Sequence, residues 1–196
     1  MPNRLRPTIY VSSVTILLAL SAGINVLQAQ RIRSLNAANI PVSPAIGQAA
    51  PPIQGFALDG QPQDISLRAG VPTVVYFFSP TCSWCERNWA NVEALRNQAA
   101  GRYRVIAVSK TRDLRAYVGA HGLGIDVVEG ISDNTRQSFG FSGTPHTVVV
   151  SSDNVITHDW RGAFTARIER QIEELFEIRL PGVLPNPTDT PNPGSR

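Results

Sequence analysis

The sequence predicts an α/β fold, with a mixed central sheet flanked by helices and an N-terminal transmembrane helix ahead of it. Strand-like apolar runs alternate with helical patterns between residues 54 and 180, which favours parallel strands. An apolar hairpin near the end of that region adds antiparallel strands to the same sheet. A separate uncharged apolar run precedes the region, at residues 8–27.

The positive charge of the chain is concentrated at its N-terminus. The formal net charge is +3, but the first 34 residues hold four arginines and no acidic residue, so the remainder is nearly neutral. The basic pI therefore indicates no nucleic-acid-binding face, and we expect no nucleic-acid partner. Composition also excludes collagen, a coiled coil, disorder throughout and a disulfide-dense scaffold.

The apolar run is long enough to be a membrane helix, because about twenty helical residues span a hydrocarbon core of roughly 30 Å. We expect residues 1–34 to be a signal-anchor; arginines flank both ends and do not set its orientation. One alternative is a signal peptide cleaved near Ala19–Ala22 or Ala29. Another is a buried core helix, although no polar face interrupts the run.

Two proline-rich stretches border the predicted domain. Residues 35–53 contain four prolines among many small residues, which predicts a Pro/Ala-rich linker. Residues 181–196 contain five prolines and predict a disordered tail. The folded domain is therefore expected at residues 54–180.

The first elements of the domain follow from turn residues and hydrophobic spacing. A hairpin is expected to turn at Asp59–Gly60. The continuous apolar run over residues 72–80 predicts a strand covered on both faces. Apolar residues at helical spacing predict a helix over residues 82–100, and a second buried strand follows at residues 103–110.

The later elements complete the α/β pattern. A helix is expected from Thr111 to Gly122 and a short one at residues 132–140. A hairpin is expected around Asp153–Asn154, followed by an amphipathic helix that ends before Pro181. The predicted order is β-β-α-β-α-(β)-α-β-β-α.

The two cysteines, Cys82 and Cys85, stand where the first central strand is followed by a helix. Two cysteines three residues apart in the first turn of a helix can close a disulfide. The helix N-terminus stabilises a thiolate on the first of them. The thiolate is the attacking species in thiol–disulfide exchange, so this pattern predicts that chemistry.

Other cysteine chemistries fit the sequence less well. A four-cysteine zinc site would need a second Cys-x-x-Cys, which the sequence lacks. A zinc site of two cysteines and two histidines would require two of the three histidines to lie close to the cysteines. Haem attachment requires histidine where Glu86 stands, and peroxiredoxin chemistry requires proline and threonine where Val75 and Ser79 stand. A purely structural disulfide remains an alternative. We expect no metal, and no cofactor other than a redox-active Cys82–Cys85 disulfide.

The second signal is the run from Gly143 to Val148, GTPHTV, directly before an apolar strand. A strand, a Cys-x-x-Cys at a helix start and this Thr-Pro in the same order resemble the thioredoxin superfamily. The N-terminal anchor, the linker and the FALDG hairpin resemble its membrane-tethered TlpA/ResA-type members. The SPTCxxC context is similar to the redoxin that assists methylamine dehydrogenase maturation. The resemblance covers about residues 52–180.

The resemblance implies a thioredoxin-like fold and a cis Thr144–Pro145 bond beside the cysteines. It also implies that Thr144 backbone groups pair with an extended substrate segment. Candidate substrate-binding residues are Ser83, Trp84, Thr144 and Pro145, with Trp84 as an exposed platform. Implied partners are protein thiol or disulfide substrates and a membrane electron donor or acceptor.

Several positions depart from the family pattern. Thr81 replaces the tryptophan that usually precedes the first cysteine, and Tyr76 and Asn88 stand where relatives carry acids. No proton acceptor for Cys85 is therefore evident near it in the sequence, since Glu86 is expected to point to solvent. His146 is expected to be a solvated residue at the start of a strand.

These observations predict an enzyme, a membrane-anchored thiol–disulfide oxidoreductase acting on protein substrates. Cys82 is expected to be the nucleophile and Cys85 the resolving thiol, because a helix terminus lowers a thiol pKa and desolvation raises it. The expected location is the inner membrane, single-pass, with the domain on the periplasmic side. The resemblance favours a reductant in cytochrome or metalloprotein maturation. The alternative is a redox-inert binding or chaperone module with a structural disulfide.

Overall fold

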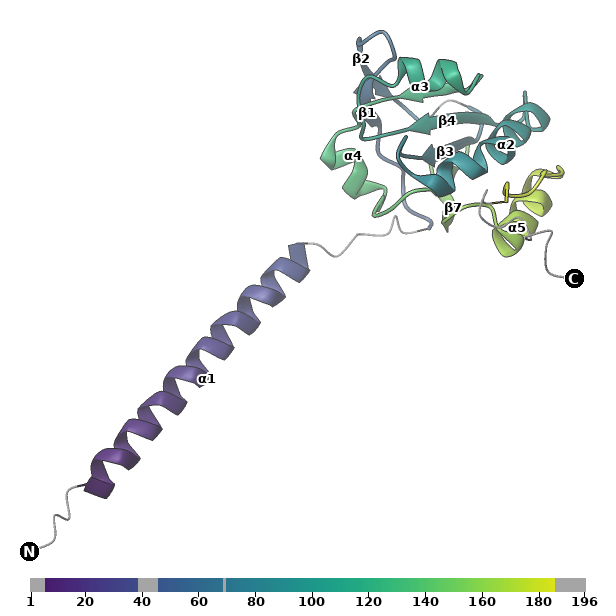
Figure 1. Cartoon of the computed structure of the whole chain (residues 1–196). Helices are drawn as coiled ribbons and strands as arrows, with labels where there is room; N and C mark the ends of the chain where they lie inside the picture. The colour runs from purple at the N-terminus through teal and green to yellow at the C-terminus, as the bar shows by residue number, and fades with distance from the viewer. Residues whose placement is uncertain (1–5, 39–45, 69, 186–196) are drawn as a thin grey trace, which may run out of the picture. The chain divides into compact units, whose positions relative to one another are not determined.

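The computed structural model describes residues 6–38, 46–68 and 70–185 (Figure 1). The chain divides into two compact units, Met1–Ile40 and Pro41–Arg196. The first unit contains α1 (Arg6–Ala38), and the second contains the remaining helices and strands.

Helix α1 is longer than the predicted apolar run and contains all of it. Its stretch Val11–Arg31 is long and apolar enough to cross a membrane, a test that a signal sequence would also pass. A polar side chain within this stretch is satisfied by the helix itself, since Thr15 Oγ1 donates to the Val11 carbonyl at 3.0 Å. By length and composition alone, this stretch meets the requirement for a signal sequence or a membrane anchor.

The second unit is built on a mixed sheet, as predicted. The five strands have the order β5-β4-β3-β6-β7. Strands β3, β4 and β5 are parallel, whereas β6 is antiparallel to both β3 and β7. Two further strands pair as a separate hairpin. The bounds are β1 (Ile53–Phe56), β2 (Pro62–Ile65), β3 (Thr73–Phe77), β4 (Arg104–Val108), β5 (Asp126–Val128), β6 (His146–Val150) and β7 (Ile156–Arg161).

Both faces of the sheet are covered, so that every residue of β3 and β6 is buried and most of them are apolar. On one face, α2, α3 and α5 contribute residues such as Trp89, Val118 and Ile172 to one core cluster. On the other face, Ile53 and Phe141 belong to a second core cluster, together with the buried side chains of the same strands that point to that face. The helices are α2 (Ser83–Gln98), α3 (Arg115–Ala120), α4 (Asp133–Ser138) and α5 (Ala166–Phe176).

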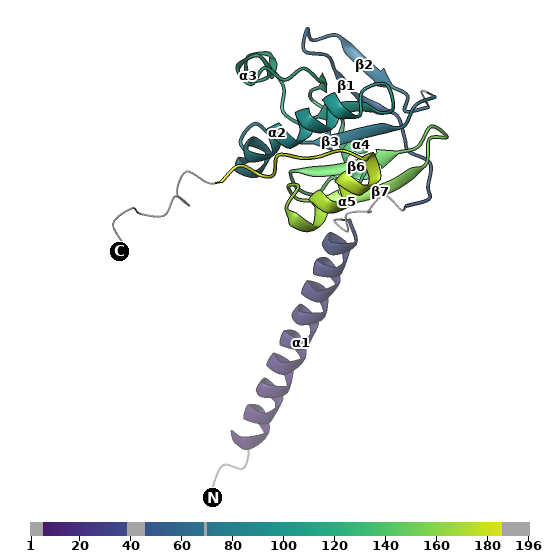
Figure 2. The ribbon, with the colours of Figure 1, turned by 90° about the vertical axis from the view of Figure 1, so that its right-hand side faces the viewer.

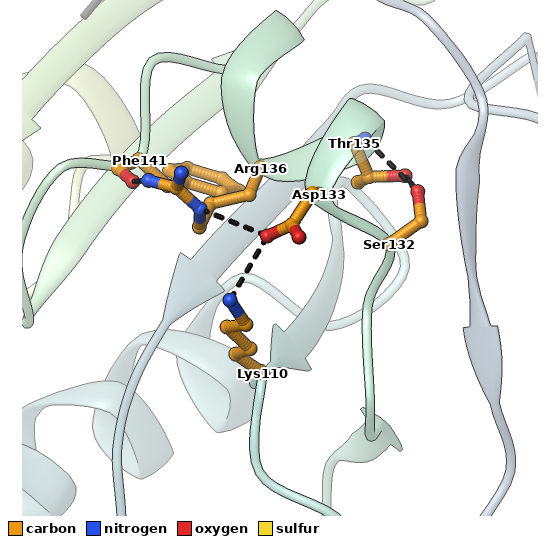
Figure 3. A network of polar contacts seen from close by, with 6 residues as sticks. All are labelled: Lys110, Ser132, Asp133, Thr135, Arg136 and Phe141. Atoms are coloured by element: carbon orange, nitrogen blue, oxygen red, sulfur yellow. Dashed lines mark hydrogen bonds and ion pairs between the residues drawn. The ribbon is translucent and has the colours of Figure 1, made fainter. Parts of the chain in front are cut away.

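A polar network fastens α4 to the end of β4 (Figure 3). Ser132 caps the helix by accepting a backbone hydrogen bond at 3.0 Å. Asp133 accepts a hydrogen bond from Lys110 Nζ at 2.9 Å and pairs with Arg136 Nε at 3.5 Å. Arg136 also donates to the Phe141 carbonyl at 3.1 Å. These contacts hold the segment that leads into the loop before β6.

The ordered contacts of this unit extend beyond residues 54–180. Gly47 N donates to the Ile156 carbonyl at 2.8 Å, within the stretch expected to be linker. In the stretch expected to be tail, Leu184 N donates to the Arg87 carbonyl at 3.1 Å, and the yellow end of the chain runs beside α2 (Figure 2). Residues 35–38 of the expected linker form the end of α1 instead, and residues 39–45 and 186–196 of the two expectations lie outside the described residues.

Candidate active site

The two cysteines lie at the beginning of α2, after β3 ends. Cys82 is the N-cap residue, with an extended backbone (φ −92°, ψ 108°), and its Sγ accepts a hydrogen bond from the Cys85 backbone N–H at 3.3 Å. The first N–H groups of a helix lack partners within the helix, and an N-cap side chain normally satisfies one of them. Here a sulfur atom does so, and Cys82 therefore lies in the positive field of the helix N-terminus.

Cys82 is the more acidic thiol of the pair. Partial burial acts to raise its pKa. Hydrogen bonding with the Cys85 thiol, with the Thr144 side chain and from the backbone N–H groups of Cys85 and Trp84 outweighs burial, so the pKa of Cys82 lies below its ordinary value. A lowered pKa gives more thiolate near neutral pH. The geometry therefore equips Cys82 to attack.

Cys85 is fully buried, one turn further along the helix, in the apolar row with Trp89 and Val92. Burial, together with the hydrogen bond and the charge of Cys82, raises the pKa of Cys85 to about 12. Both thiols are free in the structure. A thiol that is protonated and inaccessible, but adjacent to a reactive one, is suited to react with Cys82 inside the same molecule.

Thr144 contacts Cys82, although 62 residues separate them in the chain. The Cys82 thiol donates to the Thr144 carbonyl oxygen with an Sγ–O distance of 3.4 Å. The Thr144–Pro145 bond is cis, as the resemblance implies. Thr144 is half-buried and Pro145 is buried. The fold thus brings the Cys-x-x-Cys and Thr-Pro motifs together.

Ser83 and Trp84 form the exposed side of the motif. Trp84 keeps 46% of its surface exposed, which confirms its predicted position at the surface. The Arg87 guanidinium carbon lies 4.4 Å from the centre of the Trp84 ring. This cation–π contact orients an aromatic side chain between the two cysteines.

A buried polar cluster lies beneath the cysteines, at two of the positions that depart from the family pattern. Asn88 Nδ2 donates to Tyr76 Oη at 3.2 Å. Asn88 Oδ1 accepts hydrogen bonds from Asn91 Nδ2 and from the Phe164 backbone N–H, both at 3.0 Å. One amide therefore joins β3, α2 and the loop before α5. No spacing rule predicts this meeting, because it depends on how α2 packs on the sheet.

Glu86 is exposed, as expected from the sequence, but its carboxylate has partners on α3. Its carboxylate contacts His121 Nε2 at 2.6 Å and accepts a hydrogen bond from Tyr117 Oη at 3.1 Å. The hydrogen bond to the Tyr117 carbonyl is the main cause that raises the pKa of His121, and Glu86 raises it further, against burial. The contact between Glu86 and His121 requires α3 to lie against α2, so the sequence alone could not predict that these two residues pair.

The expectation that His146 is solvated is wrong. Its side chain is 1% exposed, and Nε2 is hydrogen-bonded to Asp159 on the neighbouring strand. Alternation along β6 places His146 on the same face as Val148, opposite α2, with its ring 5.2 Å from that of Phe141. Burial lowers the pKa of His146, although Asp159 opposes this.

The fold and the site together define a thioredoxin-like thiol–disulfide oxidoreductase, in which a Cys-x-x-Cys pair begins the first helix after a central strand. A family model described as Redoxin matches residues 45–175, and the chain belongs to the Redoxin family. No curated protein matches the sequence significantly.

Solved structures share the fold at low sequence identity. The thioredoxin domain of a thiol-disulfide oxidoreductase from Bacteroides vulgatus is 21% identical, with a TM-score of 0.57, 67% of this chain covered and 98% of that chain. A thioredoxin family thiol:disulfide interchange protein from Chlorobium tepidum TLS is 20% identical, with a TM-score of 0.53, 67% of this chain covered and 97% of that chain. A Chlorobium tepidum protein described as the thiol:disulfide interchange protein DsbE is 16% identical, with a TM-score of 0.60, 69% of this chain covered and 98% of that chain.

Proposed function

We propose that this redoxin is a membrane-anchored, extracytoplasmic oxidoreductase that exchanges disulfides with protein substrates through Cys82 and Cys85. The single observation that carries the proposal is the asymmetry of the two thiols. Cys82 is partly exposed with a lowered pKa, whereas Cys85 is buried with a pKa raised to about 12. Thiol–disulfide exchange needs one thiolate that attacks a substrate and a second thiol that releases it.

In the reducing direction, the Cys82 thiolate attacks one sulfur of a substrate disulfide. A Cys82–substrate disulfide forms, and the other substrate sulfur leaves with the electron pair. Cys85 then attacks Cys82 Sγ, the mixed disulfide breaks, and the second substrate thiolate takes up the Cys85 proton. The substrate gains two electrons and the enzyme is left with a Cys82–Cys85 disulfide, so an electron donor must reduce it before the next cycle.

The proposed substrate surface consists of Ser83, Trp84, Thr144 and Pro145. The contact between Cys82 and Thr144 supports it, because a substrate sulfur bonded to Cys82 must come to lie beside the Thr144 backbone. Extended peptides bind by pairing with exposed backbone groups, which suits a protein substrate better than a small one. Trp84 offers exposed aromatic area next to the reacting sulfur.

The proposed arrangement of the chain is a signal-anchor at residues 1–34, a linker at 35–53, the catalytic domain at 54–180 and a tail at 181–196, in which part of the linker and the start of the tail pack on the domain through Gly47 and Leu184. The apolar stretch Val11–Arg31 supports an anchor. In spheroplasts, the full-length protein should remain with membranes and be digested by protease added outside. A soluble form starting near residues 23–30, or protection from that protease, would contradict this arrangement.

The enzymatic proposal is tested by reduction of insulin disulfides with a thiol donor supplied. Wild-type protein should accelerate the reaction, and Cys82→Ser should abolish the acceleration. Cys85→Ser should still attack but not release, so that disulfide-linked complexes with cellular proteins accumulate. Cys82→Ser is the matched control and should trap almost none. Insulin reduction at the uncatalysed rate would favour the redox-inert binding module. Cytochrome or metalloprotein precursors among the trapped proteins would support a reducing role in their maturation.

A further inference from the structure

Two exposed apolar side chains from distant parts of the chain lie on either side of Arg87, in the first turns of α2. One is Trp84, between the two cysteines, and the other is Leu184, which is 53% exposed. The Arg87 guanidinium carbon lies 4.4 Å from the centre of the Trp84 ring, and its Nε donates to the Leu184 carbonyl at 2.6 Å. Although 97 residues separate Leu184 from Arg87, the fold places Leu184 on the surface that begins at Trp84.

The segment that carries Leu184, residues 177–185, is fastened along α2 (Figure 2). Near its start, Gln98 Nε2 donates to the Arg179 carbonyl at 2.6 Å, and the Arg179 N–H donates to Gln98 Oε1 at 3.0 Å. Apolar side chains near this contact pack in the core. Near its end, the Leu184 N–H donates to the Arg87 carbonyl at 3.1 Å. Leu184 is therefore held in a defined position on α2.

A single exposed leucine is ordinary in a folded protein, but two apolar side chains held together form a binding surface. Among the described residues of the second unit, the other large apolar side chains that are exposed are Ile46 and Val71. Val71 precedes β3, at the end of that strand opposite the cysteines. The surface at Trp84 and Leu184 is thus specific to the end of the sheet at which exchange takes place.

The exchange reaction itself brings a polypeptide to this surface. A substrate sulfur bonded to Cys82 places the residues that flank the substrate cysteine around the first turn of α2. An apolar side chain among them would cover the exposed parts of Trp84 and Leu184. Because the C-terminal segment is already ordered on α2, binding there would cost little further conformational entropy on the enzyme side.

We propose that Leu184 is a specificity-determining residue that, with Trp84, binds an apolar side chain next to the reacting cysteine of a protein substrate. This inference rests on the proposed function and names its substrate class, which is a segment with an apolar residue beside the cysteine. Arg87 is a positioning residue, because it contacts both side chains. Leu184 takes no part in the chemistry at sulfur, so a disulfide without flanking side chains should react equally well without it.

The test compares two oxidised peptide dimers that differ only in the residue beside the cysteine, leucine in one and serine in the other. With a thiol donor supplied, full-length wild-type protein should reduce the leucine peptide with a kcat/KM at least about tenfold higher. Covering the exposed half of a leucine changes binding about three- to tenfold. Leu184→Ser should therefore lower the preference by that factor, through a higher KM for the leucine peptide and with kcat unchanged.

Two matched variants and a small substrate control the comparison. Val71→Ser also removes an exposed apolar side chain and should keep the wild-type preference. Leu184→Phe retains an apolar side chain at the surface and should keep the preference as well. Bis(2-hydroxyethyl) disulfide has no flanking side chain, and every variant should reduce it at the wild-type rate.

The outcomes separate this inference from the proposed function. Equal turnover of both peptides by the wild-type protein, or an unchanged preference in Leu184→Ser, would overturn the inference alone. An equal loss toward both peptides and the small disulfide in Leu184→Ser would give the C-terminal segment a structural role and overturn it too. Failure of the wild-type protein to reduce any of these disulfides would refute the proposed function, and the inference with it.

Discussion

The difference between the two thiols should be measurable by alkylating the reduced full-length protein with iodoacetamide at pH 7. Only thiolates react, and a thiol whose pKa is about 12 is ionised to about one part in 100,000 at this pH. The pKa of Cys82 lies below the ordinary 9.0, so at least about one part in a hundred of Cys82 is thiolate. The thiolate fractions therefore differ at least about a thousandfold.

The rates should differ less than the fractions, because a thiolate of higher pKa is the stronger nucleophile. With a Brønsted slope of about 0.4–0.5 over the roughly three pKa units between 9.0 and 12, a Cys85 thiolate reacts about 15–30 times faster than a Cys82 thiolate. Cys82 should therefore be alkylated at least about thirty- to sixtyfold faster, before the burial of Cys85 slows it further. The assay is peptide mass spectrometry of samples quenched over time. Equal rates, or faster labelling of Cys85, would refute the assignment of Cys82 as the attacking thiol.

Three further outcomes follow from single contacts. Gly55→Ala should reduce the free energy of unfolding by about 1–3 kcal/mol, because the new Cβ would lie 2.9 Å from the Glu129 carbonyl oxygen; unchanged urea unfolding would contradict that contact. Trp84→Ala should raise KM for insulin while leaving exchange with a small aromatic disulfide unchanged, since Trp84 is exposed and away from the core; an equal loss with both substrates would remove its binding role. The raised pKa of His121 means that its contacts stabilise the fold fully below pH 6.5 and lose this effect as pH rises through the folded pKa. His121→Gln should weaken the dependence of the urea unfolding midpoint on pH in this range. An unchanged pH dependence would exclude His121 as its source.

The fold could be predicted from local patterns because each pattern has one physical cause. The continuous apolar run around β3 indicates a strand covered on both faces, and the structure buries all five of its residues. Cys82 and Cys85 could be placed at a helix start for the same reason, because the strand-like apolar run ends near residue 80 and helical spacing of apolar residues begins near residue 82. The expected helix ran to residue 100, whereas α2 ends at Gln98.

The parts of the site that could not be predicted are contacts between elements. Glu86 and His121 meet only when α3 packs against α2, and Tyr76 and Asn88 only when α2 packs on the sheet. His146 was assigned to solvent because a histidine after a proline carries no sign of which sheet face it occupies. Alternation along β6, fixed by how that strand pairs in the sheet, decides the face. The register pairs His146 with Arg161 of β7, and His146 reaches Asp159, two residues before Arg161, by a hydrogen bond.

The contact between Arg87 and Leu184 has a practical consequence for anyone who modifies the protein. The two residues exchange two hydrogen bonds, Leu184 N to the Arg87 carbonyl at 3.1 Å and Arg87 Nε to the Leu184 carbonyl at 2.6 Å. Arg87 also lies over Trp84, so this attachment point is adjacent to the exposed side of the cysteine motif. A purification tag or fluorescent fusion joined directly after Leu184 would start next to Arg87 and Trp84, and we expect it to compete with large substrates for the proposed binding surface. A label joined within the β1–β2 turn at Gly60, where a Cβ would meet no atom within 4 Å, avoids that interference.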